Sequence, residues 1–199
     1  MKLDSVHDLQ TVYRKLVDST SRPGFISDLV PEADKLDDTV DFSESILLLA
    51  LTLLDPEVSF KVYSKESHMV SEKISTLTYA KKKDADEADY IFVLKDAEEG
   101  SLVEAIQQGK PGTLKDPHVS ATIITEVDRL SDDGELLLTG PGIQKSNTVA
   151  VGESDSWVEA RQFKNTEYPM GIDLLFVDKQ HQLLALPRTT RIIKNRVMN

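Results

Sequence analysis

The pattern of apolar and polar residues predicts helices in five segments of the chain. Between residues 5 and 18 they recur every three or four positions, which predicts an amphipathic helix, and Ser5 with Asp8 fits a capping box at its start. Residues 43–54 are apolar almost all round and predict a buried helix that ends before Pro56. The other predicted helices lie at residues 67–77, 102–107 and 157–163.

Strand-like patterns separate these helices. Asp133-Gly134 is typical of a hairpin turn and predicts a return strand at residues 135–139, followed by a tight turn at Gly140-Pro141-Gly142. Polar connections are expected at residues 31–41, 81–89 and 112–117. The other predicted strands are short runs rich in apolar residues, at residues 25–30, 58–63, 90–94, 121–127, 172–177 and 183–186.

The order of these elements indicates the fold class. Helices alternate with strands in the first half, and the second half is rich in predicted hairpins. This order favours the α/β class, with a single domain over residues 1–199 in which a mixed β-sheet is flanked by helices. A chain of 199 residues is long enough for one well-buried core. The tail after about residue 191 is expected to be flexible.

Charge is distributed unevenly along this chain, whose formal net charge is −11. Seven acids and one base lie between residues 28 and 44, whereas residues 179–199 hold five bases and no acid. A surface this acidic disfavours binding to nucleic acid. The basic end predicts contact with an anionic ligand or an acidic partner, and a solvated tail is the simpler interpretation for Lys194 and Arg196.

The types of residue present exclude several kinds of site. The chain has no cysteine, so disulfides, thiolate metal sites and a cysteine nucleophile are excluded. No phosphate-binding loop or serine nucleophile elbow is present. Lys95, which follows a predicted strand, is the one local candidate for a Schiff-base lysine. The histidines match no metal-binding spacing; they are His7, His68, His118 and His181. We therefore predict no catalytic residue, no metal and no cofactor.

The apolar runs also bear on location. The longest one, residues 46–54, is well short of the ~20 residues that span a bilayer. The first residues show no apolar run with a cleavage site, so no secretory signal is expected. These observations predict a soluble, cytoplasmic protein without a membrane partner.

Charged residues and an apolar strand pattern coincide between residues 168 and 191. Asp173 lies within a predicted strand, where a carboxylate needs a partner. Arg188 follows the next predicted strand and would meet Asp173 if the two strands form a hairpin. This pair either pins the hairpin as a salt bridge or belongs to an anion or partner site, in which Thr189 and Thr190 supply hydroxyl donors.

Short motifs along most of the chain occur in a distinctive order. The first is Tyr13-Arg14-Lys15-Leu16, followed by Ser21-Arg22-Pro23-Gly24. The later ones are residues 52–55, Gly112-Thr113 with Pro117 and Ser120-Ala121-Thr122, residues 138–143, Pro169 with Gly171-Ile172-Asp173, and Leu186-Pro187-Arg188-Thr189-Thr190. Together they resemble the PhnH family, a subunit of the carbon–phosphorus lyase machinery of bacterial phosphonate catabolism.

This resemblance implies a fold similar to the large domain of pyridoxal-phosphate-dependent transferases, without the cofactor. It implies a homodimer that also joins PhnG-, PhnI- and PhnJ-like subunits. The family contributes to the synthesis of α-D-ribose 1-methylphosphonate 5-triphosphate from ATP and methylphosphonate, and we expect this chain to be a non-catalytic or site-completing subunit. The candidate ligand or interface residues are Arg188, Thr189, Thr190, Asp173, Gly171 and Arg14.

Two other functions stay open. A small-molecule module for a phosphonate or nucleotide would bind its ligand saturably without partner subunits. A stand-alone transferase that retains pyridoxal phosphate would be yellow and would lose its absorbance band on borohydride treatment.

Overall fold

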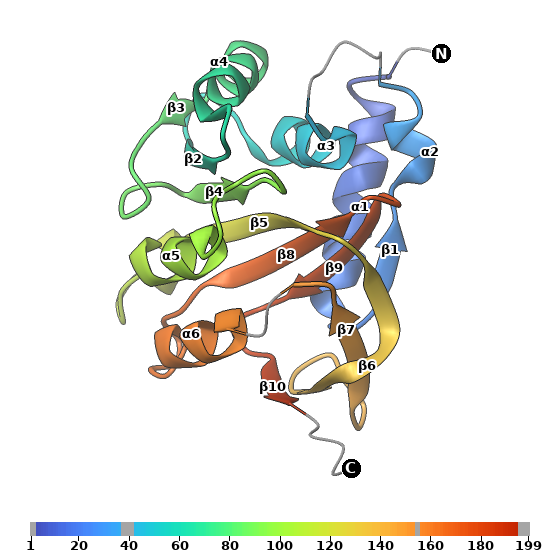
Figure 1. Ribbon diagram of the computed structural model, residues 1–199, viewed down its shortest axis with the longest axis vertical. Coiled ribbons are helices and arrows are strands. Elements are labelled where there is room, and N and C mark those ends of the chain that lie inside the picture. Colours follow the sequence, from blue (N-terminus) through green and yellow to red (C-terminus); the bar gives the residue numbers. More distant parts are fainter. Residues whose placement is uncertain (1–2, 37–41, 154–155, 195–199) are drawn as a thin grey trace.

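A seven-stranded sheet forms the centre of the computed structural model, which describes residues 3–36, 42–153 and 156–194 (Figure 1). Its strands are β1 (Ile26–Asp28), β2 (Ser59–Tyr63), β3 (Lys81–Lys82), β4 (Tyr90–Val93), β5 (Thr122–Val127), β8 (Asp173–Asp178) and β9 (Gln182–Leu186). They lie in the order β1-β9-β8-β5-β4-β2-β3. Every pair from β8 to β3 is parallel, whereas β9 runs antiparallel to both of its neighbours. The predicted mixed sheet is confirmed.

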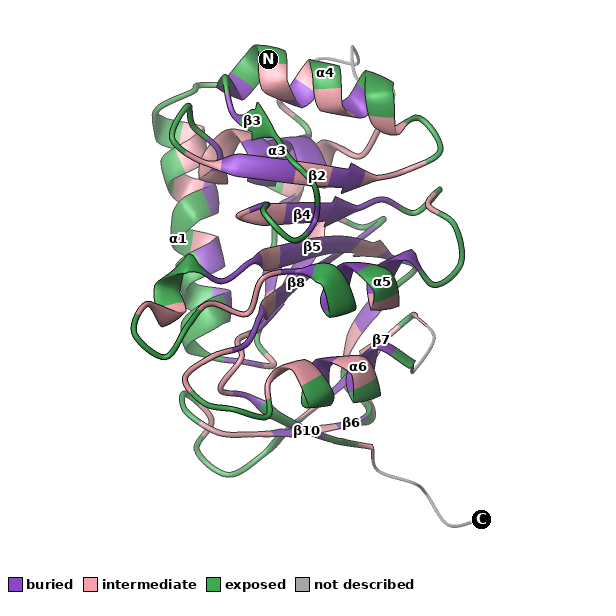
Figure 2. Cartoon of the chain, turned by 90° about the vertical axis from the view of Figure 1, so that its left-hand side faces the viewer, coloured by how far each residue is buried: buried purple, intermediate pink, exposed green. Residues whose placement is uncertain are grey.

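Helices cover both faces of this sheet (Figures 1 and 2). One face carries α1 (His7–Ser21), α2 (Val30–Ala33), α3 (Glu44–Leu53) and α4 (Ser67–Thr78). The other face carries α5 (Ser101–Gln108), α6 (Ser156–Lys164) and a second, three-stranded sheet. That small sheet has the order β10-β6-β7, with β6 (Leu130–Thr139), β7 (Asn147–Val151) and β10 (Arg191–Lys194). A single 3-10 turn (Pro117–Val119) precedes β5.

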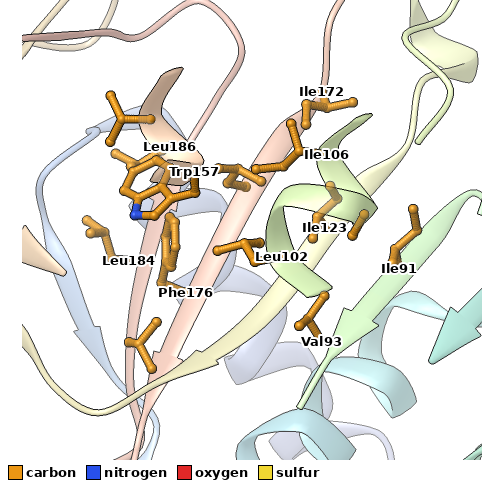
Figure 3. Close-up of a cluster of buried hydrophobic side chains, with 14 of the residues drawn as sticks. Ile91, Val93, Leu102, Ile106, Ile123, Trp157, Ile172, Phe176, Leu184 and Leu186 are labelled. Atoms are coloured by element: carbon orange, nitrogen blue, oxygen red, sulfur yellow. The ribbon is translucent and has the colours of Figure 1, made fainter. Parts of the chain in front are cut away.

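Two apolar clusters fill the space between these layers. On the α5 and α6 side, Trp157 packs against Phe176 with ring centroids 4.9 Å apart (Figure 3). On the other side, Val12 and Ile46 from the helices meet Ile124 of β5. The central strands are buried on both faces, which explains why their sequences are nearly continuous apolar runs.

The predicted helices are all present, but the cap of the first one is wrong. Asp4, and not Ser5, caps α1, because the Asp4 carboxylate accepts the N–H groups of Val6 and His7 at 2.8 and 2.9 Å. Asp8 does take part, since its carboxylate accepts the backbone N–H of Asp4. The predicted box between Ser5 and Asp8 is therefore replaced by a reciprocal pair of Asp4 and Asp8, four residues apart.

The predicted hairpin at Asp133-Gly134 is also wrong. Both residues lie within β6, at an irregularity in its pairing with β7 between Ser131 and Leu136. A Cβ on Gly134 would lie 2.3 Å from the backbone nitrogen of Ala150. The glycine is needed here because β7 passes close to the backbone of β6, and not because the chain turns.

Two predicted connections contain short regular elements. The polar segment at residues 31–41 begins inside α2, and its residues 37–41 lie outside the described part of the chain. The charged segment at residues 81–89 contributes β3 to the edge of the main sheet.

The chain end is ordered further than expected. Residues 191–194 form β10 and pair with β6, so the expectation of a flexible tail after about residue 191 is wrong for residues 192–194. Lys194 Nζ lies 3.1 Å from the carboxylate of Glu159, whereas Arg196 lies outside the described residues. Across the described ranges, no helix combines the length and apolar character needed to cross a bilayer.

Candidate functional site

Segments that are distant in the sequence meet at the edge of the sheet where β5 and β8 begin. Ser120 precedes β5, Asp173 opens β8, and Arg188 follows β9, which returns to this edge because it is antiparallel. The turn after β6 reaches the same place, since a Cβ on Gly140 would lie 2.9 Å from the carbonyl oxygen of Thr189. We call this region the motif corner and define it by Ser120, Gly140, Gly171, Asp173 and Arg188.

An ion pair between Arg188 and Asp173 forms the centre of the motif corner. Arg188 Nε and Nη2 donate to the two carboxylate oxygens, and the backbone N–H of Arg188 donates to Oδ1 at 2.6 Å. The guanidinium also donates to Ser120 Oγ and, at 2.8 Å, to the carbonyl oxygen of Pro117. The two side chains are only 17% and 28% exposed. The predicted meeting of Arg188 and Asp173 is confirmed, and it ties β8 and β9 to the loop before β5.

Gly171 permits close packing at the motif corner. Its φ is +140°, and a Cβ there would lie 2.6 Å from Oδ1 of Asn165. The Asn165 side chain bridges the backbone of Ile172, accepting its N–H at 2.8 Å and donating to its carbonyl oxygen at 3.2 Å. A larger residue at position 171 would displace this bridge, so the geometry gives Gly171 a backbone role.

A second arginine, Arg161 on α6, contacts the backbone of the motif corner and is 2% exposed. Its Nη1 donates to the carbonyl oxygen of Thr190 at 3.1 Å, and its Nη2 donates to those of Pro187 and Leu186 at 2.5 and 3.5 Å. Burial lowers the pKa of Arg161 to about 10, although the nearby Asp173 acts in the opposite direction. This buried cation holds residues 186–190 through their carbonyl groups.

The motif corner borders a hollow of about 620 Å³. Among the described residues that line it none is acidic, and two are arginines, which is a local concentration of positive charge in a chain of net charge −11. Guanidinium, hydroxyl and amide groups are donors suited to anionic oxygens. We call it the arginine hollow, lined by Thr139, Gly140, Pro141, Asn165, Thr166, Tyr168, Met170, Arg188, Thr189 and Arg191.

The structure places the other predicted site residues differently. Thr189 lines the arginine hollow. Thr190 is 2% exposed, and its hydroxyl has no hydrogen-bond partner among the described residues, so this side chain is buried beside the hollow and does not line it. Arg14 is exposed on α1, which covers the opposite face of the sheet from α6, and the structure does not bring it to the motif corner.

The remaining sequence candidates lie elsewhere. Lys95 is at the opposite edge of the sheet, where its Nζ lies 3.0 Å from the carboxylate of Asp128. His181, in the turn between β8 and β9, has its Nδ1 2.9 Å from Ser45 Oγ. In the part of the chain that the structure describes, no group of three or more histidines, cysteines and acids is placed to hold a metal ion.

Comparison with known proteins now adds to this geometry. A family model described as bacterial phosphonate metabolism protein (PhnH) matches residues 2–193. The chain belongs to the PhnH family.

Two curated relatives agree with this assignment. The chain is 32% identical over 184 residues to the "Putative C-P lyase subunit protein HtxG" of Stutzerimonas stutzeri, covering 92% of this chain and 85% of that protein. It is 31% identical over 192 residues to the "Alpha-D-ribose 1-methylphosphonate 5-triphosphate synthase subunit PhnH" of Rhizobium meliloti (strain 1021), covering 95% of this chain and 92% of that protein.

Most of the PhnH-like segments gather in one region of the fold. The central, turn and C-terminal segments supply the motif corner, as described above. The opening segment lies next to them. Asn147 Nδ2 donates to the carbonyl oxygen of Pro23 at 2.7 Å. A Cβ on Gly142 would lie 2.1 Å from the carbonyl oxygen of Ser21. The family motifs therefore describe a shared three-dimensional junction.

Sequence reasoning missed two residues that build the motif corner of this PhnH-family chain, Arg161 and Asn165. A signal for Arg161 was available: it lies four residues after Trp157 and so falls on the inward face of a predicted helix, where an arginine is unusual. Asn165 carried no such signal, because it follows the helix in an irregular segment.

Proposed function

We propose that this chain is the PhnH-type subunit of a carbon–phosphorus lyase system and contributes to the synthesis of α-D-ribose 1-methylphosphonate 5-triphosphate from ATP and methylphosphonate. The observation that carries this proposal is the family match over residues 2–193, together with a relative whose name gives it as a subunit of that synthase. A cytoplasmic location belongs to the proposal, because the cytoplasm supplies the ATP.

In this proposal the chain completes a site and does not carry out the bond-breaking chemistry itself. The arginine hollow supports this role, because its donors are suited to bind and orient phosphonate or nucleotide phosphate oxygens. Arg188 is already engaged by Asp173 and Ser120. Arg191 and Thr189 are therefore the groups that we expect to contact the anion.

The partners in this proposal are a second copy of the chain and PhnG-, PhnI- and PhnJ-like subunits. Light scattering coupled to gel filtration tests this, first on the chain alone and then on mixtures with the three subunits. We expect a dimer that enters a larger particle. A chain that stays apart from all three subunits would contradict the subunit role, whatever it binds by itself.

The variant Arg191→Ala tests the arginine hollow. Loss of a charge-assisted hydrogen bond should weaken binding of methylphosphonate or ATP to the assembled complex by about tenfold or more. Calorimetry on the complex measures this, with Arg22→Ala as the matched control, because Arg22 is an arginine that does not line the hollow. Equal affinities for Arg191→Ala and the parent would remove the hollow from the site. Saturable binding of methylphosphonate or ATP by the isolated chain would instead favour the small-molecule module.

We further propose that the architecture is related to the large domain of pyridoxal-phosphate-dependent transferases without the cofactor. A mostly parallel seven-stranded sheet with one reversed strand and helices on both faces supports this relation. Titration with pyridoxal phosphate tests the alternative of a stand-alone transferase. We expect no absorbance band that borohydride removes, and a band lost in Lys95→Ala would revive that alternative.

A further inference from the structure

A crevice of about 260 Å³ lies at the opposite edge of the main sheet, where β4 and β5 end. It opens beside the first turns of α5 and α6, which pack side by side on this face (Figure 1). Its apolar residues include Val93, Leu102 and Trp157, which belong to the cluster drawn in Figure 3. In open α/β sheets ligands bind outside the carboxyl ends of the strands. We call this space the carboxyl-edge crevice.

Three hydrogen-bonding groups that line the crevice have no partner within the described ranges. Thr125 of β5 is 1% exposed, and its hydroxyl makes no hydrogen bond to any described residue. The backbone N–H groups of Leu102 and Val103, in the first turn of α5, likewise donate to none of the described residues. Their neighbours differ, since the N–H of Ser101 donates to the carbonyl oxygen of Glu98.

These three groups suit the acidic head of a ligand. A helix N-terminus attracts negative charge through its free N–H groups, and the Thr125 hydroxyl, which faces the same crevice without a protein partner among the described residues, adds a third donor there. The helix has eight residues, and Thr125 is on a different element, so the two observations are independent.

The rim of the crevice has the opposite character. Glu98 and Glu99 are exposed there, and Glu126 is half-buried, with one carboxylate oxygen accepting the backbone N–H of Lys95 at 3.0 Å. The ammonium group of Lys95 is paired with Asp128 and does not neutralise the rim. These acids would repel a ligand that carries only negative charge, whereas a ligand that carries only positive charge would leave the three donors unused.

We propose that the carboxyl-edge crevice binds a small zwitterion, whose acid group accepts from Thr125 and the amides of Leu102 and Val103 while its ammonium group faces the carboxylates of the rim. A volume of about 260 Å³ is room for roughly eight water molecules at about 30 Å³ each, which matches a ligand of the size of a small amino acid. The site is separate from the arginine hollow and does not rest on the function proposed for it.

Calorimetry on the full chain tests this proposal with β-alanine and 2-aminoethylphosphonate. Both probes are zwitterions, and they distinguish a carboxylate head from a phosphonate head. We expect saturable binding of at least one of them at millimolar concentration, and much weaker binding of ethylphosphonate and ethylamine, which each lack one charge. Failure of both zwitterions to saturate, or equal binding of ethylphosphonate, would overturn the proposal.

Variants of Thr125 locate the binding. Thr125→Val keeps the shape of the side chain and removes the hydroxyl, so it should raise the dissociation constant about tenfold. Thr125→Ser keeps the hydroxyl and should bind the ligand as tightly as the parent. Thr122→Val is the matched control, because Thr122 is on the same strand but lines a different hollow, and it should leave binding unchanged. Glu98→Gln with Glu99→Gln should weaken binding through the rim.

Each of these variants tests whether the zwitterion binds in the carboxyl-edge crevice. Zwitterion binding that survives in Thr125→Val, with circular dichroism showing a folded protein, would place the ligand elsewhere and end the proposal. Arg191→Ala should leave the binding of β-alanine, which has no phosphonate group, intact, so failure here is distinguishable from failure of the function proposed for the arginine hollow.

Discussion

The two edges of the main sheet differ in whether the groups that line their hollows already have partners inside the molecule. At the motif corner, Arg188 and Asp173 satisfy each other, and the arginine also reaches Ser120 and a carbonyl group. At the carboxyl-edge crevice, the Thr125 hydroxyl and two amides have no partner among the described residues, and acids surround them. Arg161 Nε and Thr190 Oγ1 at the motif corner are also buried without a partner among the described residues, but they do not line the arginine hollow, whereas the three donors at the other edge line the crevice.

This difference teaches that charge alone does not identify a binding group. Arg188 is conspicuous in the sequence, yet most of its hydrogen-bonding capacity is used inside the molecule. Thr125 is inconspicuous, yet its hydroxyl is unused. Under the proposal for the carboxyl-edge crevice, a free donor in a concave place indicates a ligand better than a charge in a motif does.

The largest expected effect at the motif corner comes from Arg161→Met. The change leaves the carbonyl oxygens of Leu186, Pro187 and Thr190 buried without their donor, so the free energy of unfolding should fall by roughly 3 kcal/mol. Urea unfolding measures this. Glu159→Gln, an exposed change on the same helix, is the control and should shift stability little. If Arg161→Met were as stable as the control, the hydrogen bonds from Arg161 to residues 186–190 would not stabilise the motif corner.

A smaller effect is expected from breaking the ion pair. Asp173→Asn should lower the free energy of unfolding by about 2 kcal/mol, because both side chains are largely buried and the arginine would lose its charged partner. A double-mutant cycle with Arg188→Met measures the coupling between the two residues. Additive losses would show that the pair does not tie β8 to β9, and would return Arg188 to the set of groups available to a ligand.

A third effect, smaller again, concerns pH and a second pair at the same edge. Burial raises the pKa of Asp89, but hydrogen bonds from Lys110 and Ser59 outweigh it, and the net pKa is lowered. A carboxyl with a lowered pKa in the folded state stabilises the fold above its ordinary pKa, and this stabilisation is lost as the pH falls through the folded pKa.

Asp89→Asn should therefore reduce stability by about 1 kcal/mol at neutral pH, and the gap to the parent should narrow below pH ~4. Urea unfolding at several pH values checks this. A gap that stays constant down to the most acid pH would show that the carboxylate is not the source of the effect.

At the other edge, Thr125→Val should change the free energy of unfolding by less than about 0.5 kcal/mol, because the hydroxyl bonds to no described residue.

Much of the fold followed from local pattern. The helix at residues 43–54 and the strands of the main sheet were predictable because burial on both faces imposes long apolar runs. The pairing of Asp173 with Arg188 was predictable from a short connection between two apolar strands, which places the ends of a hairpin together.

Other features could not be predicted, because they depend on elements distant in the sequence. Gly134 resembles a turn residue, and only the passage of β7 over it shows why it is glycine. Residues 191–194 looked like a basic tail, and only the free edge of β6 makes them a strand. In both cases the partner strand supplies the reason.

The class of fold, the strands of the core and the family could be read from the sequence, since periodicity and ordered short motifs are local properties of the chain. Which polar groups have hydrogen-bond partners and which do not is visible in the folded chain alone. Arg161 reaches its three carbonyl groups across 25 to 29 residues, and Thr125 is unpartnered because no neighbouring element supplies an acceptor among the described residues. Hydrogen bonds between distant segments form only when the layers pack, so their satisfaction is a property of the fold.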